Sequence, residues 1–168
     1  QRIGAVLKSA RDIMRKDRGL SGELDRLPML TWIMFLKFLD DMERRREEEA
    51  ALGGKHRPIL KAPYRWRDWA VPTSTFAQKL SGDDFLAFIN QEKVTFPNGT
   101  TGPGLFAYLR TRTEAEGAVV ATVFRGFSNR MVSPALLKDV LVEVNKIHFD
   151  DRGESQTLGR LYESLLKE

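Results

Sequence analysis

Residues 29–39 read Met29-Leu30-Thr31-Trp32-Ile33-Met34-Phe35-Leu36-Lys37-Phe38-Leu39, and this run predicts the central helix of the chain. Only two polar residues interrupt it, so a helix here is apolar nearly all round, and such a helix is buried by its neighbours. Pro28 suits the first turn, where a proline forfeits no helical hydrogen bond. Residues 40–49 are almost wholly charged, which predicts that the same helix projects beyond the core into water until Gly53 and Gly54 end it.

Helical periodicity continues on both sides of this run. On the N-terminal side, apolar residues at helical spacing predict a first helix over about residues 3–18. On the C-terminal side, Asp83 or Asp84 can cap one helix, and Ser133-Pro134 starts another, with a cap residue followed by a proline at the first helical position. Further helices are predicted at 104–112, at 115–125 and from about Ser155.

The connections between these helices lack the alternation of strands. Residues 53–75 hold three prolines together with Tyr64, Trp66 and Trp69, which predicts a long irregular segment pinned by aromatic side chains. Residues 94–104 are rich in proline and glycine and predict a turn-rich connection. Because period-two alternation is scarce, the predicted class is all-α (mainly α), a compact bundle of about six to eight helices with a long aromatic- and proline-containing loop.

Composition describes an ordinary globular domain. The chain has 168 residues, 42% hydrophobic and 30% charged, which suffices for one domain over residues 1–168 with its own core. Cysteine is absent, which excludes disulfides and thiolate metal sites and favours a reducing compartment. No apolar run reaches the roughly 18 residues that span a bilayer, and the N-terminus lacks the pattern of a signal peptide. The net charge of +4 is compatible with a polyanionic partner.

Motifs for metal or nucleophilic chemistry are missing from the sequence. His56 and His148 stand far apart without metal-ligand spacing, so both are interpreted as surface or loop histidines. The acidic residues Glu43 and Glu47 to Glu49 alternate with arginines, which favours a solvated helix face over a metal site. Asn98-Gly99-Thr100 fits a glycosylation acceptor, but without a secretion signal it is interpreted as a turn.

One glycine motif matches a phosphate-binding pattern. Residues 102–107 fit G-x-G-x-x-A, which binds dinucleotide phosphates when it follows a strand. Here residues 96–99 read Phe-Pro-Asn-Gly rather than a strand, and Pro103 removes an amide that would face phosphate. The motif is therefore interpreted as a turn and a helix start.

Two basic clusters are the positive functional feature. The first shares one face of the first predicted helix, and the second lies in residues 55–67, a stretch without acids that also holds Lys61. The residues taken as candidates are Lys8, Arg11, Arg15 and Arg18, then Lys55, Arg57, Arg65 and Arg67. Lysine and arginine neutralise phosphates, so these eight residues are the candidate nucleic-acid contacts, with solvated surface charge as the open alternative. For the neighbouring tryptophans, packing on the core is favoured over base stacking.

The end of the sequence reads as an acidic loop and then an amphipathic helix. Leu158, Leu161, Tyr162 and Leu165 form one apolar stripe. No glycine, asparagine or proline follows Leu166 to end the helix. We therefore expect the sequence to be a fragment that leads into another domain.

These segments resemble a known family, the N-terminal helical domain of the methylation subunit of type I restriction–modification systems, an N6-adenine DNA methyltransferase. Three segments carry the likeness: the apolar helix ending Phe38-Leu39-Asp40-Asp41, the aromatic–basic Tyr64-Arg65-Trp66, and the stretch from Leu136 through His148-Phe149-Asp150 to Leu158-Gly159-Arg160-Leu161-Tyr162-Glu163. The likeness spans essentially the whole chain, and the last segment is the most specific.

The resemblance implies a supporting role. In the family, a catalytic domain that binds S-adenosylmethionine follows, with an Asn-Pro-Pro-Phe-type motif that holds a flipped adenine. This sequence contains no Asn-Pro-Pro, so no catalytic residue is carried over and the chain alone is not expected to methylate DNA. The implied partners are double-stranded DNA, the specificity subunit, a second methylation subunit and the restriction subunit, in the cytoplasm and away from any membrane.

Three rival interpretations compete with this one. The main alternative is an α-helical protein–protein interaction module with no DNA contact, whose marker would be an exposed apolar stripe on the 134–147 helix or the final helix. An independent helix-turn-helix domain is disfavoured, because no helix pair presents polar base-reading residues beside a basic flank. A standalone enzyme would need a convergent set of ionisable groups, which the sequence does not offer.

Overall fold

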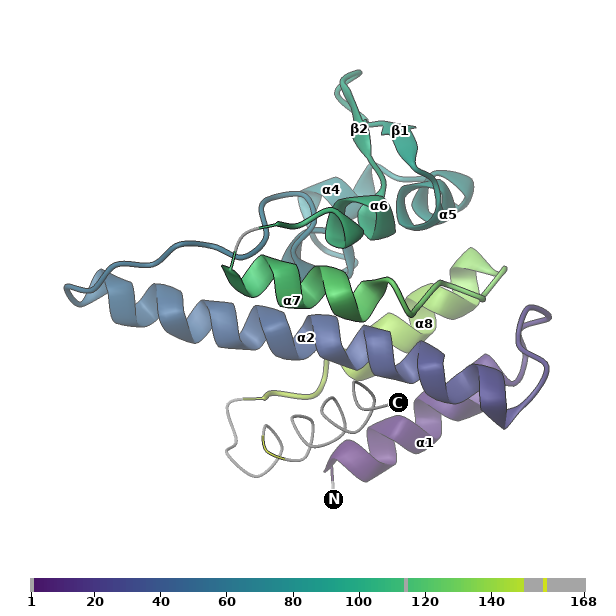
Figure 1. Cartoon of the computed structure of the whole chain (residues 1–168). Helices are drawn as coiled ribbons and strands as arrows, with labels where there is room; N and C mark the ends of the chain where they lie inside the picture. The colour runs from purple at the N-terminus through teal and green to yellow at the C-terminus, as the bar shows by residue number, and fades with distance from the viewer. Residues whose placement is uncertain (1, 114, 150–155, 157–168) are drawn as a thin grey trace.

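The computed structural model describes residues 2–113, 115–149 and 156, which form eight helices and one small hairpin. The longest helix, α2 (Glu23–Ala51), runs through the middle of the molecule (Figure 1). Its 29 residues give it a length of about 43 Å. Nearly all of the apolar run that the sequence singled out is buried in it, so α2 is the predicted central helix, and the predicted mainly α class is confirmed.

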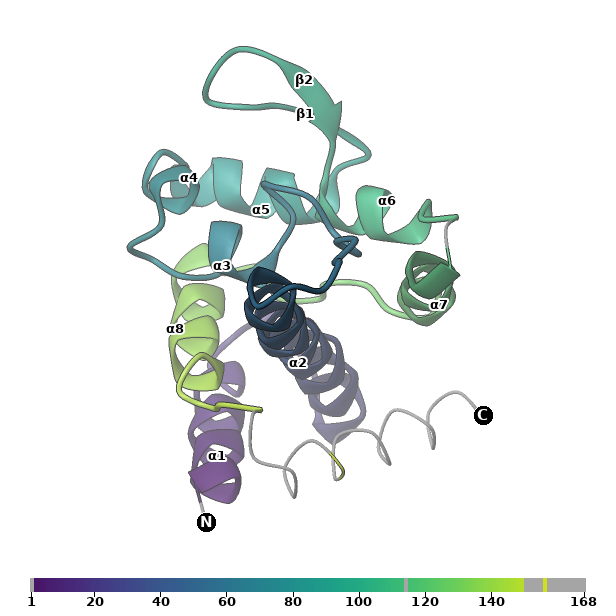
Figure 2. The same ribbon diagram turned by 90° about the vertical axis from the view of Figure 1, so that its left-hand side faces the viewer.

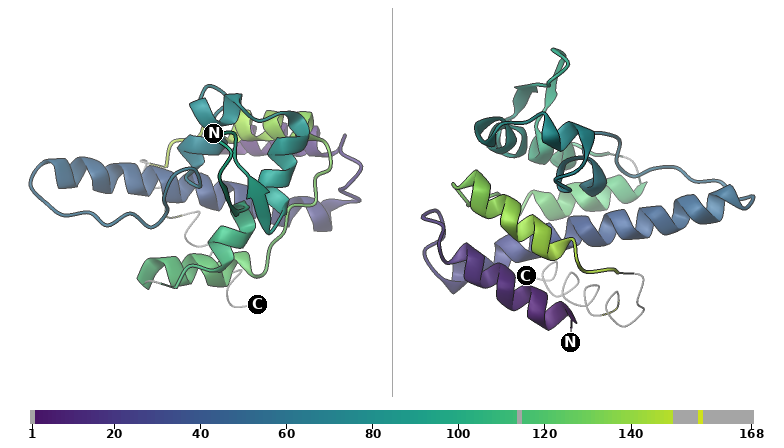
Figure 3. Two further views of the ribbon diagram at one scale, coloured as in Figure 1. Left: turned by 90° about the horizontal axis from the view of Figure 1, so that it is seen from above. Right: turned by 180° about the vertical axis from the view of Figure 1, so that it is seen from behind.

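Two helices lie along one side of α2. Helix α1 (Arg2–Met14) packs against α8 (Pro134–Val144), as the view from behind shows (Figure 3). Helix α8 begins where predicted, and the hydroxyl of Ser133 accepts a hydrogen bond from the Leu136 amide at 3.2 Å. Its apolar face is fully buried and consists of Leu137, Val140, Leu141 and Val144.

The other side of α2 carries short helices and the hairpin (Figure 2). In chain order these are α3 (Trp66–Trp69), α4 (Thr75–Gln78), α5 (Gly82–Asn90), β1 (Lys93–Thr95), β2 (Thr101–Pro103), α6 (Leu105–Arg110) and α7 (Ala115–Phe124). The strands pair antiparallel, with Val94 opposite Gly102. The sequence predicted only a turn-rich connection here, because strands of three residues are too short to show alternation.

The first two helix boundaries differ from the prediction. Helix α1 ends at Met14 instead of near residue 18, because the Asp17 carboxylate binds the Gly19 amide at 2.7 Å and turns the chain. Helix α2 begins at Glu23, five residues before Pro28, and the amide and hydroxyl of Ser21 both donate to the Asp25 carboxylate. Pro28 has no N–H to donate to the Leu24 carbonyl, and Leu24 is 92% exposed.

The cap of α5 also differs from the prediction. The hydroxyl of Ser81 accepts a hydrogen bond from the Asp84 amide at 3.1 Å, so Ser81 is the cap residue. Asp83 and Asp84 lie in the first turn, where carboxylates stabilise the positive end of a helix.

Two further findings complete the fold. None of the described helices is long and apolar enough to cross a membrane. The predicted final helix from Ser155, with its apolar stripe and the acidic loop before it, lies outside the described residues.

Candidate nucleic-acid interface

The first basic cluster lies on the solvent side of α1. Lys8, Arg15 and Arg18 are exposed and Arg11 is half-buried, while the opposite face of the helix enters the core. Arg15 directly follows the last residue of α1, and its amide still donates to the Arg11 carbonyl at 3.0 Å, so it keeps helical spacing; Arg18 lies farther along the same turn. Arg15 pairs with the exposed Asp12 at 3.0 Å, a contact that phosphate can displace at little cost.

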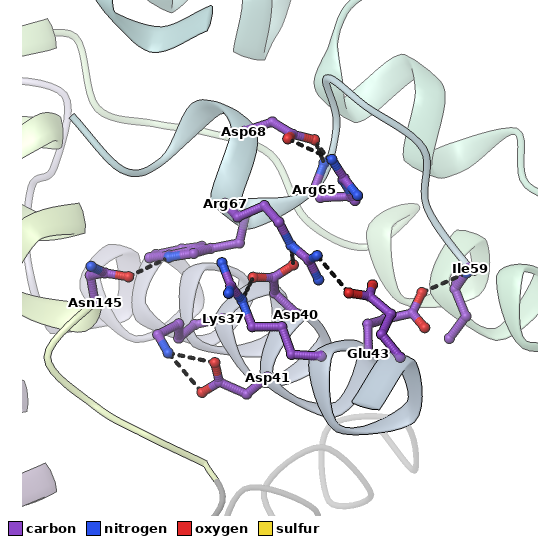
Figure 4. Close-up of polar contacts among 12 residues, drawn as sticks. Lys37, Asp40, Asp41, Glu43, Ile59, Arg65, Arg67, Asp68 and Asn145 are labelled. Atoms are coloured by element: carbon purple, nitrogen blue, oxygen red, sulfur yellow. Dashed lines mark hydrogen bonds and ion pairs between the residues drawn. The ribbon is translucent and has the colours of Figure 1, made fainter. Parts of the chain in front are cut away.

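The second cluster is divided by the fold. Lys55 and Arg57 lie exposed on the segment that follows α2. Arg65 binds both carboxylate oxygens of Asp68, at 2.9 and 3.0 Å, and Arg67 binds Asp40 and Glu47, each at 2.9 Å (Figure 4).

The Arg67 guanidinium is held within the protein. Its remaining nitrogen, Nη2, is buried and has no partner among the described residues. Burial alone would lower the pKa of Arg67, but the hydrogen bonds and charges of Glu47 and Asp40 outweigh it and raise the pKa. The same contact lowers the pKa of Glu47, mainly because the carboxylate accepts the Arg67 hydrogen bond. Arg67 therefore joins α3 to α2 and offers few donors to an external phosphate.

The charged half of α2 receives the chain that returns to it. Asp40 and Glu43 are each only 5% exposed. One Glu43 oxygen accepts a hydrogen bond from the Ile59 amide at 2.6 Å (Figure 4). The other lies 3.1 Å from Nε2 of His56. Asp41 binds Lys37 at 2.7 Å and accepts from the Phe149 amide at 2.9 Å.

The prediction that this half of the helix projects into water is therefore wrong for these side chains, and so is the solvated-face interpretation of Glu43. A sequence signal existed, since Asp40, Glu43 and Glu47 share one helix face. It pointed to a carboxylate-lined face that a basic or amide-rich segment can cover.

The tryptophans beside the second cluster belong to the core, as predicted. Trp66 and Trp69 are buried, and Trp66 Nε1 donates to the Asn145 side chain at 2.9 Å. Tyr64 stacks on Tyr108 with ring centroids 3.7 Å apart. These three rings are packed in the interior of the protein, so they cannot stack on a DNA base.

The histidines are loop residues, as interpreted. His148 is exposed, whereas the His56 side chain is 10% exposed because of its contact with Glu43. No group of three potential metal ligands occurs among residues 2–113, 115–149 and 156.

The G-x-G-x-x-A motif serves packing between chain segments. Gly104 caps α6, which confirms the predicted helix start, although the short strand β2 does precede it. A Cβ atom at Gly104 would lie 2.0 Å from the Gln91 carbonyl oxygen and 2.7 Å from that of Phe88. The Pro103 carbonyl accepts a hydrogen bond from the Tyr64 hydroxyl at 2.8 Å. Neighbouring protein atoms therefore fill the space beside Gly104, and the Tyr64 hydroxyl already binds the Pro103 carbonyl.

The exposed parts of the two basic clusters lie at opposite ends of α2. The turn that carries Arg15 and Arg18 leads directly into the start of α2, whereas Lys55 and Arg57 follow its end (Figure 1). The length of α2 separates them by about 40 Å. Phosphate binding needs only charge and reach, so each end can act as a separate contact.

Comparison with known proteins places this arrangement in a family. The chain matches the model of the HsdM N-terminal domain over residues 3–165. It is 31% identical over 166 residues to the methylase subunit of the type I restriction enzyme EcoEI from Escherichia coli, a match that covers 99% of this chain and 31% of that protein.

Two solved structures share the fold. One is a modification subunit of a putative type I restriction enzyme from Vibrio vulnificus YJ016, with 53% identity and a TM-score of 0.83 over 99% of this chain and 35% of that chain. The other comes from work on complex assembly and conformational transition of the type I R-M system. It is 30% identical, with a TM-score of 0.66, and the match covers 96% of this chain and 29% of that chain. The chain thus spans about a third of the length of these relatives.

Proposed function

The chain belongs to the HsdM N-terminal domain family, and from this premise we propose that it is the single helical N-terminal domain of a type I restriction–modification methylation subunit, preceding an S-adenosylmethionine-binding catalytic domain. The whole subunit would transfer a methyl group from S-adenosylmethionine to N6 of adenine in DNA. This domain would support DNA enclosure and subunit assembly without carrying catalysis. The observation that carries the proposal is the family match over residues 3–165.

The cofactor would bind elsewhere in the subunit. S-adenosylmethionine is held in its enzymes by a glycine-rich loop that leaves room for the ligand. The candidate loop here leaves none, since the position of a Gly104 side chain is filled by the Gln91 and Phe88 carbonyls. This loop therefore does not fit the cofactor, and no methyl-transfer step is assigned to the described residues.

DNA would be contacted through basic side chains at the surface. On α1 and the turn after it these are Lys8, Arg11, Arg15 and Arg18, and after α2 they are Lys55 and Arg57. Arg65 and Arg67 would contribute by positive potential and by holding the fold, because carboxylates already bind their guanidinium groups. Such contacts add affinity without reading sequence.

Assembly would use the start of α2. Leu24 is 92% and Leu27 is 61% exposed, and three residues apart they lie on one helix face. The related structure of 30% identity concerns complex assembly of the type I system, and subunit contacts need exposed apolar anchors. We propose that this pair contacts another subunit: the specificity subunit or a second methylation subunit, with the restriction subunit joining the complete complex.

The activity is tested with the intact subunit and its partners. Incubation with duplex DNA and methyl-labelled S-adenosylmethionine, followed by nucleoside analysis, should give N6-methyladenine, whereas the 168-residue chain alone should give none. Label on cytosine, or activity of the isolated chain, would contradict the proposal. Since the substrate is DNA, we expect the protein in the cytoplasm.

The DNA role is tested separately from assembly. Changing Lys8, Arg11, Arg15 and Arg18 together to Gln should weaken DNA binding and lower the slope of log K against log salt by about 3 to 4. A matched change of the exposed Lys79 and Lys93 to Gln should leave the slope unchanged. Changing Leu24 and Leu27 to Asp should instead weaken assembly of the subunits.

The alternative is an interaction module without DNA contact, and the exposed Leu24 and Leu27 favour it as much as they favour assembly. On α8, where its marker was expected, only Val142 is an exposed large apolar residue. If the four-residue α1 variant assembles normally and keeps the DNA affinity and salt slope of the parent, while the leucine variant fails to assemble, the α1 contacts are absent and the interaction module is favoured.

A further inference from the structure

On the hairpin side of α2, the cations Lys61, Arg112 and Arg125 have no carboxylate partner among the described residues. Lys61 and Arg125 are exposed and Arg112 is half-buried. Arg112 Nε donates to the Tyr108 carbonyl at 3.2 Å, and Arg125 Nη2 lies 3.5 Å from the Arg110 carbonyl. Their contacts with carbonyls leave the positive charge uncompensated, in contrast to Arg65 and Arg67.

Tyr108 brings two of these cations together. The Lys61 amide donates to the Tyr108 hydroxyl at 3.0 Å, so the segment after α2 touches α6 at this ring. The Arg112 guanidinium lies over the same ring, 3.9 Å from its centroid. Arg125 directly follows α7. The last residue of that helix, Phe124, accepts a hydrogen bond at its carbonyl from Arg110 Nε at 2.9 Å. Residues distant in sequence thus meet at the ends of α6 and α7.

The Arg112 side chain is ordered before any ligand arrives. Tyr108 is buried and stacks on Tyr64 with an interplanar angle of 7°. This stack gives Arg112 a rigid platform, and the bond from Nε fixes the plane of the guanidinium. A pre-organised guanidinium loses less conformational freedom when its remaining N–H groups bind phosphate oxygens.

Acidic residues are scarce in the segments that form this surface. Residues 50–67 hold five basic residues and no acidic one, and residues 93–138 hold six basic and two acidic residues, although the net charge of the whole chain is only +4. One of the two acids, Glu116, is paired with Arg46 at 2.7 Å; the other, Glu114, lies outside the described residues. The segments therefore carry a net positive charge that exceeds that of the chain.

We propose that Lys61, Arg112 and Arg125 form a contact surface for the sugar–phosphate backbone of duplex DNA. This rests on the proposed function as a domain of a DNA-handling subunit, and it adds a surface on the side of α2 opposite α1 (Figures 1 and 2). An acidic protein surface is the other possible partner. It is disfavoured because protein interfaces need an apolar core, and of the exposed large apolar residues only Val119 lies on the helices of this surface.

The test is the salt dependence of DNA binding by the assembled complex. A duplex of about 30 base pairs without the recognition sequence is titrated at several salt concentrations. The variant Lys61→Gln/Arg112→Gln/Arg125→Gln should lower the slope of log K against log salt by about 2.7, since each phosphate contact contributes about 0.9. The double variant Lys61→Gln/Arg125→Gln avoids the Tyr108 stack and should lower the slope by about 1.8. Arg112→Lys should keep the slope, because it keeps the charge.

Controls separate this proposal from the function on which it rests. Lys79→Gln changes an exposed lysine outside these segments and should leave the slope unchanged. If the double variant keeps the slope while the α1 variant lowers it, the domain binds DNA but this surface is wrong. If both keep it, the contacts proposed for Lys8, Arg11, Arg15 and Arg18 fail as well. If the double variant loses subunit assembly but not the DNA slope, the surface binds protein and the proposal is overturned.

Discussion

Asp17 shows how one buried carboxylate fixes the join between distant parts of the chain. It is buried and accepts hydrogen bonds from the amides of Gly19, Val132 and Ser133, at 2.7 to 3.2 Å. The turn after α1 is thereby bound to the segment that starts α8. A Cβ atom on Gly19 would lie 2.0 Å from the Arg130 carbonyl oxygen, so the two segments are in direct contact.

Asp17→Ala should therefore destabilise the protein by about 3 kcal/mol, because buried amide donors lose their acceptor. Chemical denaturation measures this free energy of unfolding. Asp12→Ala is the matched control, since Asp12 is exposed and pairs with the exposed Arg15; its cost should stay below about 0.5 kcal/mol. Equal effects of the two substitutions would contradict the role given to Asp17.

Glu47 predicts how stability responds to acid. Its hydrogen bond with Arg67 holds its folded-state pKa below the ordinary value of 4.5. A carboxylate with a lowered folded pKa adds stability above its unfolded pKa, and that stability is lost as the pH falls through the folded pKa.

Glu47→Gln should thus lower the Tm by about 2 °C at pH 7, as expected for one partly exposed ion pair. The difference from the parent should shrink as the pH is lowered from about 5 to about 3, measured by thermal unfolding followed by circular dichroism. Glu48→Gln, at an exposed neighbouring position, should show no such trend. A Tm difference that stays constant with pH would show that the Arg67 contact adds nothing.

At the scale of elements, the junction between the hairpin and α6 depends on the absence of a side chain at Gly104. The carbonyls of Gln91 and Phe88 occupy the place of a Cβ atom, and backbone atoms cannot rotate away. Gly104→Ala should destabilise the protein by about 3 kcal/mol, as overpacking does.

Gly4→Ala is the matched control for that substitution. Gly4 lies in α1, and a Cβ atom added there would meet no other atom within 4 Å. Alanine should therefore stabilise the helix at this position by about 0.5–1 kcal/mol. Opposite signs are expected in denaturant melts of the two variants. If Gly104→Ala left the free energy of unfolding unchanged, α5 and α6 would have to move apart at no cost to make room for the methyl group.

The elements differ in how far the sequence could predict them. The start and the apolar face of helix α8 were predictable, because the Ser133-Pro134 signal and the apolar spacing are local features. The end of α1 was not, because it depends on Asp17 contacts with residues more than a hundred positions away. The hairpin was missed because its strands have three residues each.

For the whole molecule, the charged residues show the same difference between what local sequence predicts and what only the fold decides. The basic clusters were visible in the sequence, but which cations the fold pairs with carboxylates was not. Arg65 and Arg67 looked equivalent to Lys55 until the fold placed carboxylates beside them. The surface at Lys61, Arg112 and Arg125 needs the Tyr108 contacts, which join segments about 50 residues apart.

The central claim is that this domain supplies DNA contacts and leaves methyl transfer to the rest of the subunit. The most direct measurement is single-turnover methyl transfer to duplex DNA by the assembled complex, for the parent and for the variant with Lys8, Arg11, Arg15 and Arg18 changed to Gln. We predict a higher Kd for DNA and, at saturating DNA, an unchanged rate of methyl transfer. A reduced rate at saturation with an unchanged Kd would contradict the claim.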